Sequence, residues 1–361
     1  MSSFKRARLT GGLGVIALAA VIAGSSASAG AATPAKKATG NRIAIFYYNP
    51  SPYGIASLKG AQDEAKKLGL KLDAFDANND PQTQSTQIQD AITSGKYKAF
   101  WVWGLNDIAL NPIIKKAEQA GIKVAAADYT WGSLAQQATL TPTKGFITTI
   151  GQPIAPEAAN LIKTMNAACK HQVGSKHCNI AFLPGLANYP TDTNRENVMT
   201  AYYKKHSSKY TFTLMPPGQY DQAASQKVAQ TYFTANKNVN VMATFGDQMA
   251  AGALTAMKLV GGYTPGKNIA VIGYGGAQEQ VAEVKSGILF ATLGLYPVAE
   301  SVIGIKDIAS ALKGKKVPDV VDIINTTTRP AIINKAFLQK FPKYVPDWDL
   351  AGNPVGDPTI P

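Results

Sequence analysis

The fold is decided by the stretch Arg42-Ile43-Ala44-Ile45-Phe46-Tyr47-Tyr48-Asn49-Pro50-Ser51-Pro52-Tyr53-Gly54. Its first half is an apolar run rich in aromatic and β-branched residues, which predicts a buried strand. The residues that follow, Ser57-Leu58-Lys59-Gly60-Ala61-Gln62-Asp63-Glu64-Ala65-Lys66-Lys67-Leu68, predict an amphipathic helix. A strand, a short loop and a helix in this order form one βα unit of an α/β protein.

The same alternation of apolar runs and amphipathic stretches continues along the chain. A first set of predicted strands is Ile43–Tyr48, Lys71–Phe75, Ala99–Val102, Lys123–Ala127 and Phe146–Ile150. A second set is Asn179–Leu183, Tyr210–Met215, Val241–Phe245, Ile269–Tyr274 and Ile288–Leu293. The predicted helices are Ser57–Leu68, Thr83–Ser94, Ile108–Ala120, Pro156–Cys169, Arg195–Lys204, Tyr220–Ala235, Gln248–Val260, Ala277–Ser286 and Tyr296–Leu312. This pattern predicts two successive parallel sheets covered by helices.

Residues 1–30 have the three-part layout of a secretory signal peptide. Three basic residues, Lys5, Arg6 and Arg8, precede an apolar run over 12–23, and small residues follow up to Ala29. The run is shorter than the roughly 20 residues of a membrane-spanning helix. We therefore expect export, cleavage near residues 29–32, and a location outside the cytoplasm, in the periplasm, the cell envelope or the medium.

Three further features concern the exported chain. No cysteine follows the apolar run, so we do not expect a bacterial lipoprotein, which requires acylation of such a cysteine. Residues 31–40, which include Pro34, predict a disordered leader. The formal net charge of +13 falls to +10 without residues 1–30, because that segment holds three basic and no acidic residues. The remaining lysines are dispersed over several predicted helices, so we expect no nucleic-acid partner.

The two cysteines, Cys169 and Cys178, lie close together in the sequence. An even number of cysteines at short spacing in an exported chain favours a disulfide. The alternative is a metal site, because His171 and His177 lie between them. Adjacent side chains such as those of His177 and Cys178 do not easily point at one ion. We therefore predict a structural disulfide between Cys169 and Cys178, no metal and no cofactor.

Several stretches carry a resemblance to a known family. They are the opening unit 42–69, Asp128 after the strand 123–127, the segment Phe245-Gly246-Asp247-Gln248-Met249-Ala250-Ala251-Gly252-Ala253-Leu254, and Val271-Ile272-Gly273-Tyr274-Gly275-Gly276. In their order and spacing they resemble the ribose-binding type, or type I, of periplasmic solute-binding proteins of sugar ABC transporters. The resemblance implies two doubly wound parallel-sheet lobes joined by a hinge of three crossings, near Ile147–Gln152, Leu295–Pro297 and Asp322–Asn325.

The implied domain organisation is discontinuous. The N-terminal lobe comprises residues 41–148 plus 297–322, and the C-terminal lobe comprises residues 149–296 plus 323–345. Residues 346–361 are expected to form an irregular tail, to which the sequence assigns no function. Ligands of such sheets bind beyond the carboxyl ends of the strands. The resemblance implies that this edge of both lobes faces a shared cleft.

Polar and aromatic residues that follow the predicted strands are therefore the candidates for ligand binding. From the first lobe they are Tyr48, Asn49, Tyr53, Trp103, Asn106, Asp128 and Tyr129; from the second they are Asn194, Arg195, Asp247 and Tyr274. Trp131, Tyr189 and Tyr296 also lie at this edge. Aromatic rings can stack on a sugar or hold an aromatic ligand, and charged groups can hydrogen-bond hydroxyls. The resemblance implies a stacking role for Tyr53 and sugar contacts for Asp128 and Arg195.

Each candidate also has a structural alternative. Asp128 and Arg195 could serve as a helix cap or an ion pair. Large aromatic side chains such as those of Tyr53 and Trp103 are ordinary packing residues. Asp247 precedes a predicted helix and suits an N-cap.

Three positions depart from the ribose-type pattern. Gly246, Gly275 and Leu295 stand where such sequences usually have Asn, Asp and Gln. A site that hydrogen-bonds each hydroxyl of its ligand loses affinity when those partners are missing. Ribose itself is therefore not the expected ligand.

These features predict the substrate-binding component of an ABC importer. It would act as a monomer, capture a small solute by hinge closure and deliver it to a membrane permease. A sugar or polyol is the expected solute. The alternatives are an aromatic or less hydroxylated solute, or a role as ligand sensor for a membrane kinase or chemoreceptor.

Enzymatic function is not predicted. The three histidines are His171, His177 and His206, and none follows a predicted strand, where a catalytic base would belong. The sequence lacks a nucleophile elbow, a phosphate-binding loop and a His-Glu-x-x-His motif. Lactose-repressor-type regulators share the two-lobe core but begin with a DNA-binding helix-turn-helix, whereas this chain begins with a predicted signal peptide. We therefore expect a binding protein.

Overall fold

The computed structural model describes residues 40–129, 131–187, 189–327 and 329–349. The expected signal peptide, the leader apart from Gly40, and residues 350–361 of the tail lie outside the described residues. No helix within the described ranges is long and apolar enough to cross a membrane.

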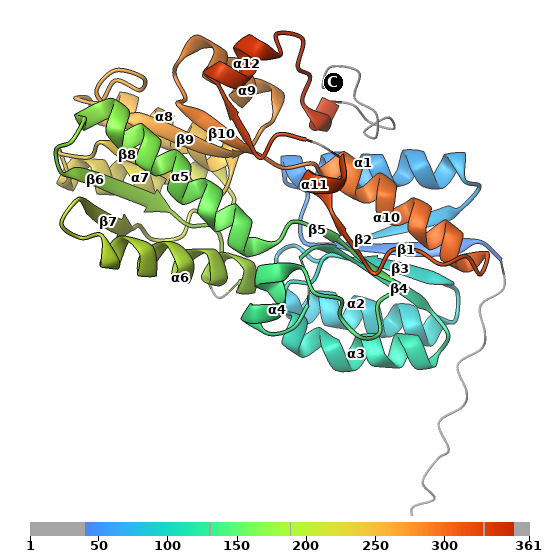
Figure 1. The fold of residues 1–361 in the computed structure, drawn as a ribbon. Coiled ribbons are helices and arrows are strands. Elements are labelled where there is room, and N and C mark those ends of the chain that lie inside the picture. The colour runs from blue at the N-terminus through green and yellow to red at the C-terminus, as the bar shows by residue number, and fades with distance from the viewer. Residues whose placement is uncertain (1–39, 130, 188, 328, 350–361) are drawn as a thin grey trace, which may run out of the picture. The chain divides into compact units, whose positions relative to one another are not determined.

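The described residues form two six-stranded sheets, each with helices on both faces (Figure 1). The strands of the first sheet are β1 (Arg42–Tyr47), β2 (Lys71–Asp76), β3 (Ala99–Val102), β4 (Lys123–Asp128), β5 (Thr148–Gly151) and β11 (Val320–Asp322). Those of the second are β6 (Cys178–Leu183), β7 (Tyr210–Leu214), β8 (Val241–Thr244), β9 (Ala270–Gly275), β10 (Ala291–Gly294) and β12 (Ile332–Asn334). Their orders, β11-β5-β4-β3-β1-β2 and β12-β10-β9-β8-β6-β7, confirm the predicted doubly wound lobes.

Two strands were not predicted. β11 and β12 have three residues each, which is too short for an apolar pattern to stand out. β11 pairs with β5 in parallel, whereas β12 pairs with β10 antiparallel. Each sheet therefore gains an edge strand, and the second sheet is mixed rather than purely parallel.

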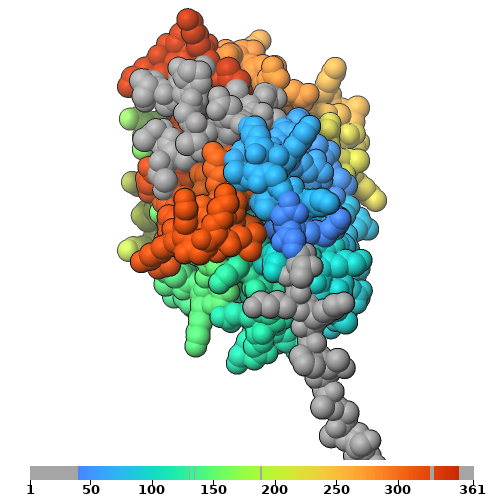
Figure 2. Space-filling model, turned by 90° about the vertical axis from the view of Figure 1, so that its right-hand side faces the viewer, coloured from blue at the N-terminus to red at the C-terminus, as the bar shows by residue number. Residues whose placement is uncertain are grey.

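The first lobe has a separate core on each face of its sheet. Ile43 and Ile45 of β1 pack toward α1 (Pro52–Lys67) and α10 (Pro297–Leu312), while Ala44 and Phe46 pack toward α2 (Pro81–Ser94) and α3 (Asp107–Gln119). Successive side chains of a strand point to opposite faces, so a fully apolar strand serves both cores. α1 and α10 lie side by side (Figure 2, blue and orange). The short helix α4 (Leu134–Thr139) precedes β5, and the short helix α11 (Ile323–Thr327) follows β11.

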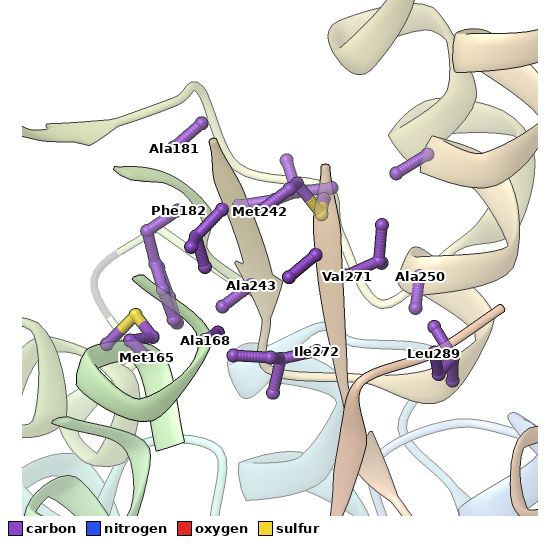
Figure 3. Packing of buried hydrophobic residues seen from close by; sticks show 14 of the residues in the cluster. Met165, Ala168, Ala181, Phe182, Met242, Ala243, Ala250, Val271, Ile272 and Leu289 are labelled. Atoms are coloured by element: carbon purple, nitrogen blue, oxygen red, sulfur yellow. The ribbon is translucent and has the colours of Figure 1, made fainter. Parts of the chain in front are cut away.

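The core of the second lobe is one large cluster. Met165 and Ala168 pack near Phe182, Ala243 and Ile272, which come from three neighbouring strands (Figure 3). The helices of this lobe are α5 (Ile154–Val173), α6 (Pro190–Lys205), α7 (Gln222–Ala235), α8 (Asp247–Val260), α9 (Gln278–Ser286) and α12 (Lys335–Lys340). The predicted disulfide is confirmed: Cys169 of α5 bonds to Cys178 at the start of β6, with their Cα atoms 5.8 Å apart.

Two helices that reach the cleft start earlier than predicted. α1 begins at Pro52 rather than Ser57, because the Ser51 hydroxyl accepts a hydrogen bond from the Gly54 amide and proline suits the first helical position. α6 begins at Pro190 rather than Arg195. Tyr53 therefore lies in the first turn of a helix, and Arg195 in the second turn of another.

The chain passes between the lobes three times. The passages lie between β5 and α5, between β10 and α10, and between β11 and β12. Hydrogen bonds join them: Gln152 Nε2 donates to the Gly294 carbonyl (3.2 Å), and the Tyr296 hydroxyl donates to the Pro330 carbonyl (2.5 Å). The three crossings thus form one bonded hinge region.

Candidate functional site

A cavity lies between the lobes, at the carboxyl edges of both sheets. It encloses about 600 Å³, including the part that is open to solvent. The first lobe contributes Tyr48, Tyr53, Leu105 and Asp128; the second contributes Leu186, Tyr189, Arg195, Tyr220, Phe245, Gly246, Gln248 and Tyr274; Leu295 comes from the second crossing and Trp348 from the C-terminal segment. Seven of these fourteen residues are aromatic, so rings make up half of the lining residues.

Five of the eleven predicted ligand-binding residues line this cavity: Tyr48, Tyr53, Asp128, Arg195 and Tyr274. Tyr189, which the sequence also placed at this edge, lines it as well. The other six, Asn49, Trp103, Asn106, Tyr129, Asn194 and Asp247, stand outside the lining, as do Trp131 and Tyr296.

The two asparagines of the first lobe are engaged in local structure. Asn49 Nδ2 donates to Asn79 Oδ1 (3.1 Å), and Asn49 Oδ1 accepts from the Ser51 amide (3.0 Å). Asn106 caps α3, since its Oδ1 accepts from the Ala109 amide (3.1 Å). Both residues follow a strand, but their side chains stabilise the loop or the helix that comes next.

Trp103, Tyr129 and Asn194 are also buried outside the lining. The Trp103 ring meets Tyr48 and Tyr53 edge-on, with ring centres 6.2 and 6.1 Å apart. The Tyr129 hydroxyl donates to the Gly104 carbonyl (2.6 Å). Asn194 is buried within α6, one position before Arg195.

Asp247 holds the loop between β9 and α9. Its Oδ1 accepts from the Thr292 hydroxyl (2.8 Å), and its Oδ2 accepts from the Ala277 amide (2.9 Å). Asp247 is the first residue of α8, and Gly246 takes the N-cap position that we had considered for Asp247. Burial raises the pKa of Asp247 to about 6.

Asp128 ends β4 in an unusual backbone conformation. Its φ is +73°, in the left-handed region, where aspartate is one of the better tolerated residues. The neighbouring strand has Gly151 at the paired position, and a Cβ there would come within 2.0 Å of the Asp128 carbonyl oxygen. From the other lobe, the Tyr189 hydroxyl donates to Asp128 Oδ2 (3.2 Å). Burial raises the pKa of Asp128, while Arg195 and Tyr189 oppose this rise.

Glu300, which the sequence did not indicate, positions two cavity residues. It lies in the first turn of α10 and is buried. Its Oε1 accepts from the Asp128 amide, and its Oε2 accepts from the Tyr53 hydroxyl. Burial and the Asp128 charge raise the pKa of Glu300 well above its usual value. The signal in the sequence that could have identified Glu300 was a carboxyl group in the otherwise apolar first turn of α10.

Arg195 is held against the wall of the second lobe. Its Nε lies 3.4 Å from Glu157 Oε2, and its guanidinium stands over the rings of Phe245 and Tyr274, at 4.9 and 5.3 Å from their centres. Cation–π contacts of this kind strengthen when water is excluded. Burial raises the pKa of Glu157 to about 7, although Arg195 lowers it. Among the described lining residues, Arg195 is the single cation.

Asp192 plays the same supporting role for the loops of the second lobe. It accepts hydrogen bonds from the Tyr220 hydroxyl (2.6 Å) and the Leu186 amide (2.8 Å), so two cavity residues depend on it. Burial raises the pKa of Asp192 to about 6. The hydroxyls of Tyr53, Tyr189 and Tyr220 thus all donate to protein carboxyl groups rather than pointing freely into the cavity.

The lining residues that the prediction missed fall into two groups. Leu105, Leu186, Tyr220, Phe245 and Gln248 follow strands of the two sheets, so the strand-end rule could have found them. Trp348 lies in the 3-10 turn η1 (Asp347–Asp349), within the segment expected to be an irregular tail. No local pattern in the sequence connects that turn with the cleft.

The arrangement suits binding of a small molecule with flat apolar faces. Rings can stack on such faces, while Asp128 and Arg195 can hydrogen-bond polar groups. Within the described residues, no group of three or more His, Cys, Asp or Glu side chains is placed to hold a metal ion.

Comparison with known proteins agrees with this geometry. Residues 43–316 match the model of the periplasmic binding protein domain. The chain is 28% identical to the ribose import binding protein of Salmonella typhimurium over 271 residues, covering 74% of this chain and 83% of the relative. It is 25% identical to the D-allose-binding periplasmic protein of Escherichia coli over 268 residues, with coverages of 74% and 83%.

Solved structures share the fold. An ABC transporter solute-binding protein from Mycobacterium smegmatis with bound glycerol superimposes with a TM-score of 0.70 at 22% identity, covering 85% of this chain and 98% of that one. Since the family model covers most of the chain, this protein belongs to the periplasmic binding protein domain family.

Proposed function

We propose that this chain is the solute-binding component of an ABC importer, which captures a small sugar or polyol by hinge closure and delivers it to a membrane permease. The observation that carries the proposal is the shared cavity, which Asp128 lines from one lobe and Arg195 from the other. A carboxylate and a guanidinium on two lobes can hydrogen-bond hydroxyls of the same ligand. Closure of the hinge then removes that ligand from water.

Relatives support the choice of solute. The two curated relatives described above carry ribose and D-allose in their names, and the Mycobacterium smegmatis structure contains glycerol. The family supports a place outside the cytoplasm. We further propose that the protein binds without catalysis and acts as a monomer. None of the three histidines lines the cavity, which supports a binding role.

A second candidate solute is an aromatic or less hydroxylated molecule. Seven aromatic residues and three leucines line the cavity, and the hydroxyls of Tyr53, Tyr189 and Tyr220 are engaged with the protein. A solute with many hydroxyls needs a partner for each of them once it is buried. This observation favours a solute that presents flat faces and few hydroxyls.

The test is a thermal-unfolding screen of the mature protein after partial unfolding and dialysis. The panel contains D-ribose, D-allose, xylitol, glycerol, myo-inositol, nucleosides and benzoate. A ligand at 100 times its Kd stabilises by about 2.7 kcal/mol, which raises the Tm by several degrees. A shift with a sugar or polyol supports the first proposal, and a shift confined to nucleosides or benzoate supports the second.

Matched variants locate the site. Asp128→Ala should abolish the shift, whereas Asn49→Ala should keep it, because Asn49 is bonded to Asn79 outside the lining. An unchanged Kd in Asp128→Ala would remove Asp128 from the site.

A further inference from the structure

We propose that Trp348 is a specificity-determining residue of the solute site, held in the cleft by the C-terminal turn Asp347–Asp349. The proposal rests on the solute-binding function proposed above. Trp348 lines the cavity, and its Nε1 donates to the carbonyl oxygens of Gly275 and Leu295, at 3.1 Å each. Its ring meets the Tyr53 ring edge-on, with centres 5.8 Å apart. The indole therefore has a fixed position on the wall.

The residue before it anchors the turn. Asp347 is 1% exposed, and its Oδ2 accepts from the amides of Val298 (3.0 Å) and Ala299 (3.1 Å) at the start of α10. A carboxylate is stabilised at a helix N-terminus by the unpaired amides there. Asp347 Oδ1 lies 3.3 Å from Arg329 Nη2, and both side chains are buried. The turn is thus tied to the first lobe and to the third crossing.

The second lobe provides room for the indole through a glycine. A Cβ on Gly275 would lie 3.2 Å from Trp348 Cζ2 and 2.7 Å from Asp247 Oδ2. Gly275 has a φ of +153°, a conformation that other residues rarely adopt. The Trp348 ring can therefore occupy this place because position 275 carries no side chain.

Gly246 repeats this arrangement on the same lobe. A Cβ there would lie 3.3 Å from Tyr220 Cδ1, so a second ring stands close to a second glycine. Two positions that could present hydrogen-bonding side chains to a solute instead leave space beside aromatic rings. Since the Trp348 N–H is already donated to Gly275 and Leu295, the indole offers the solute a ring surface. Trp348 thereby selects solutes by the shape of an apolar face.

Calorimetric titration of the mature protein and its variants tests the proposal. The probes are D-ribose, D-allose, xylitol, glycerol and myo-inositol. For the sugar that the wild type binds most tightly, Trp348→Ala should weaken Kd at least tenfold and change the order of preference among the five. Trp348→Phe, which keeps a ring, should lose less affinity for the sugar. It can be measured in place of Trp348→Ala if the alanine variant does not fold. Unchanged Kd values, within twofold, in both variants would overturn the proposal.

A matched control separates the site from general effects on the C-terminal segment. Phe341, at the C-terminal end of α12, is an aromatic residue that precedes this segment, packs against Phe337 and does not line the cavity. Phe341→Ala should bind the same sugar within twofold of the wild type. An equal loss in Phe341→Ala would show that Trp348 acts only through the stability of the segment.

Tryptophan fluorescence reports contact directly. Trp101, Trp103 and Trp131 are at most 1% exposed, whereas Trp348 is only partly buried. Quenching by acrylamide in the wild type should therefore come mainly from Trp348 and decrease at least twofold when the bound sugar covers it. Quenching that stays the same at saturating sugar would contradict the assignment.

A further arm distinguishes failure of this inference from failure of the proposed function. If none of the five probes binds the wild type, the sugar proposal fails, and free indole decides the role of the ring. Indole should raise the Tm of Trp348→Ala by at least 2 °C more than that of the wild type, because only the variant leaves the space between Gly275 and Tyr53 to be refilled. No shift in the variant would overturn the inference about Trp348.

Discussion

Replacing Glu300 with glutamine should leave the protein nearly as stable as the wild type at pH 7, whereas replacing it with alanine should be strongly destabilising. Glu300 is buried and accepts hydrogen bonds from the Asp128 amide and the Tyr53 hydroxyl. Its pKa is raised well above the usual value by burial and by the Asp128 carboxylate. This favours the protonated carboxyl, which a glutamine amide resembles in shape and polarity.

The magnitudes follow from the two hydrogen bonds. In the glutamine variant, Oε1 still accepts from the Asp128 amide, and the Tyr53 hydroxyl, which donates to Oε2 in the wild type, turns to accept from Nε2, so the expected loss is below about 1 kcal/mol. In the alanine variant both partners are left buried without an acceptor. Each unsatisfied group costs about 1–3 kcal/mol, which gives a loss of about 2–6 kcal/mol in the free energy of unfolding.

Urea unfolding at pH 7, followed by circular dichroism, measures the difference. Glu279→Gln is the control, since Glu279 is exposed in the first turn of α9 and its loss should change stability by no more than about 0.5 kcal/mol. An equal loss of stability in the glutamine and alanine variants would refute a protonated Glu300. That result would mean that Glu300 is ionised and that the position needs its charge.

Three further perturbations have defined outcomes. Burial raises the pKa of Glu157 to about 7 in the folded protein, against 4.5 in the unfolded chain, so the folded state binds more protons than the unfolded state between these two pH values. The free energy of unfolding should therefore fall as the pH rises from about 4.5 to 7. Glu157→Gln should flatten the curve of Tm against pH. Gly151→Ala should cost about 1–3 kcal/mol and weaken binding, since the new Cβ collides with the Asp128 carbonyl; a Tm equal to the wild type would contradict this. Removing the Cys169–Cys178 disulfide should cost about 3 kcal/mol, measured as the urea midpoint with and without reductant.

The fold was predictable because the pattern that specifies each helix or strand lies within its own stretch of sequence. The strands are short apolar runs and most helices show apolar residues every three or four positions, so type and order can be read directly. The same rule, applied to residues after strands, found Tyr48 and Asp128 but also Asn49 and Asn106. It cannot separate them, because a polar residue after a strand can either reach the cleft or stabilise the next loop or helix.

Glu300 and Trp348 could not be predicted for a different reason. Glu300 bonds to Asp128, 172 positions away, and Trp348 bonds to Gly275, 73 positions away. No periodicity links residues so far apart. The departures at Gly246 and Gly275 were visible in the sequence, but only as lost side chains. The structure adds that Tyr220 and Trp348 stand beside these glycines.

The aromatic rings and the glycines of the cavity together determine how strongly it can bind a hydroxylated solute. A hydroxyl that leaves water and finds no partner in the cavity costs about 1–3 kcal/mol, or roughly a factor of 5 to 150 in Kd. An aromatic contact contributes about 0.5–1.5 kcal/mol in addition to the free energy of burying its apolar surface. One unmatched hydroxyl can therefore cancel the gain from one or two of the rings that line this site. Removal or methylation of a hydroxyl that faces Trp348 should then tighten binding, whereas the same change at a hydroxyl that meets Asp128 or Arg195 should weaken it, so a series of deoxy sugars would map which wall each hydroxyl meets.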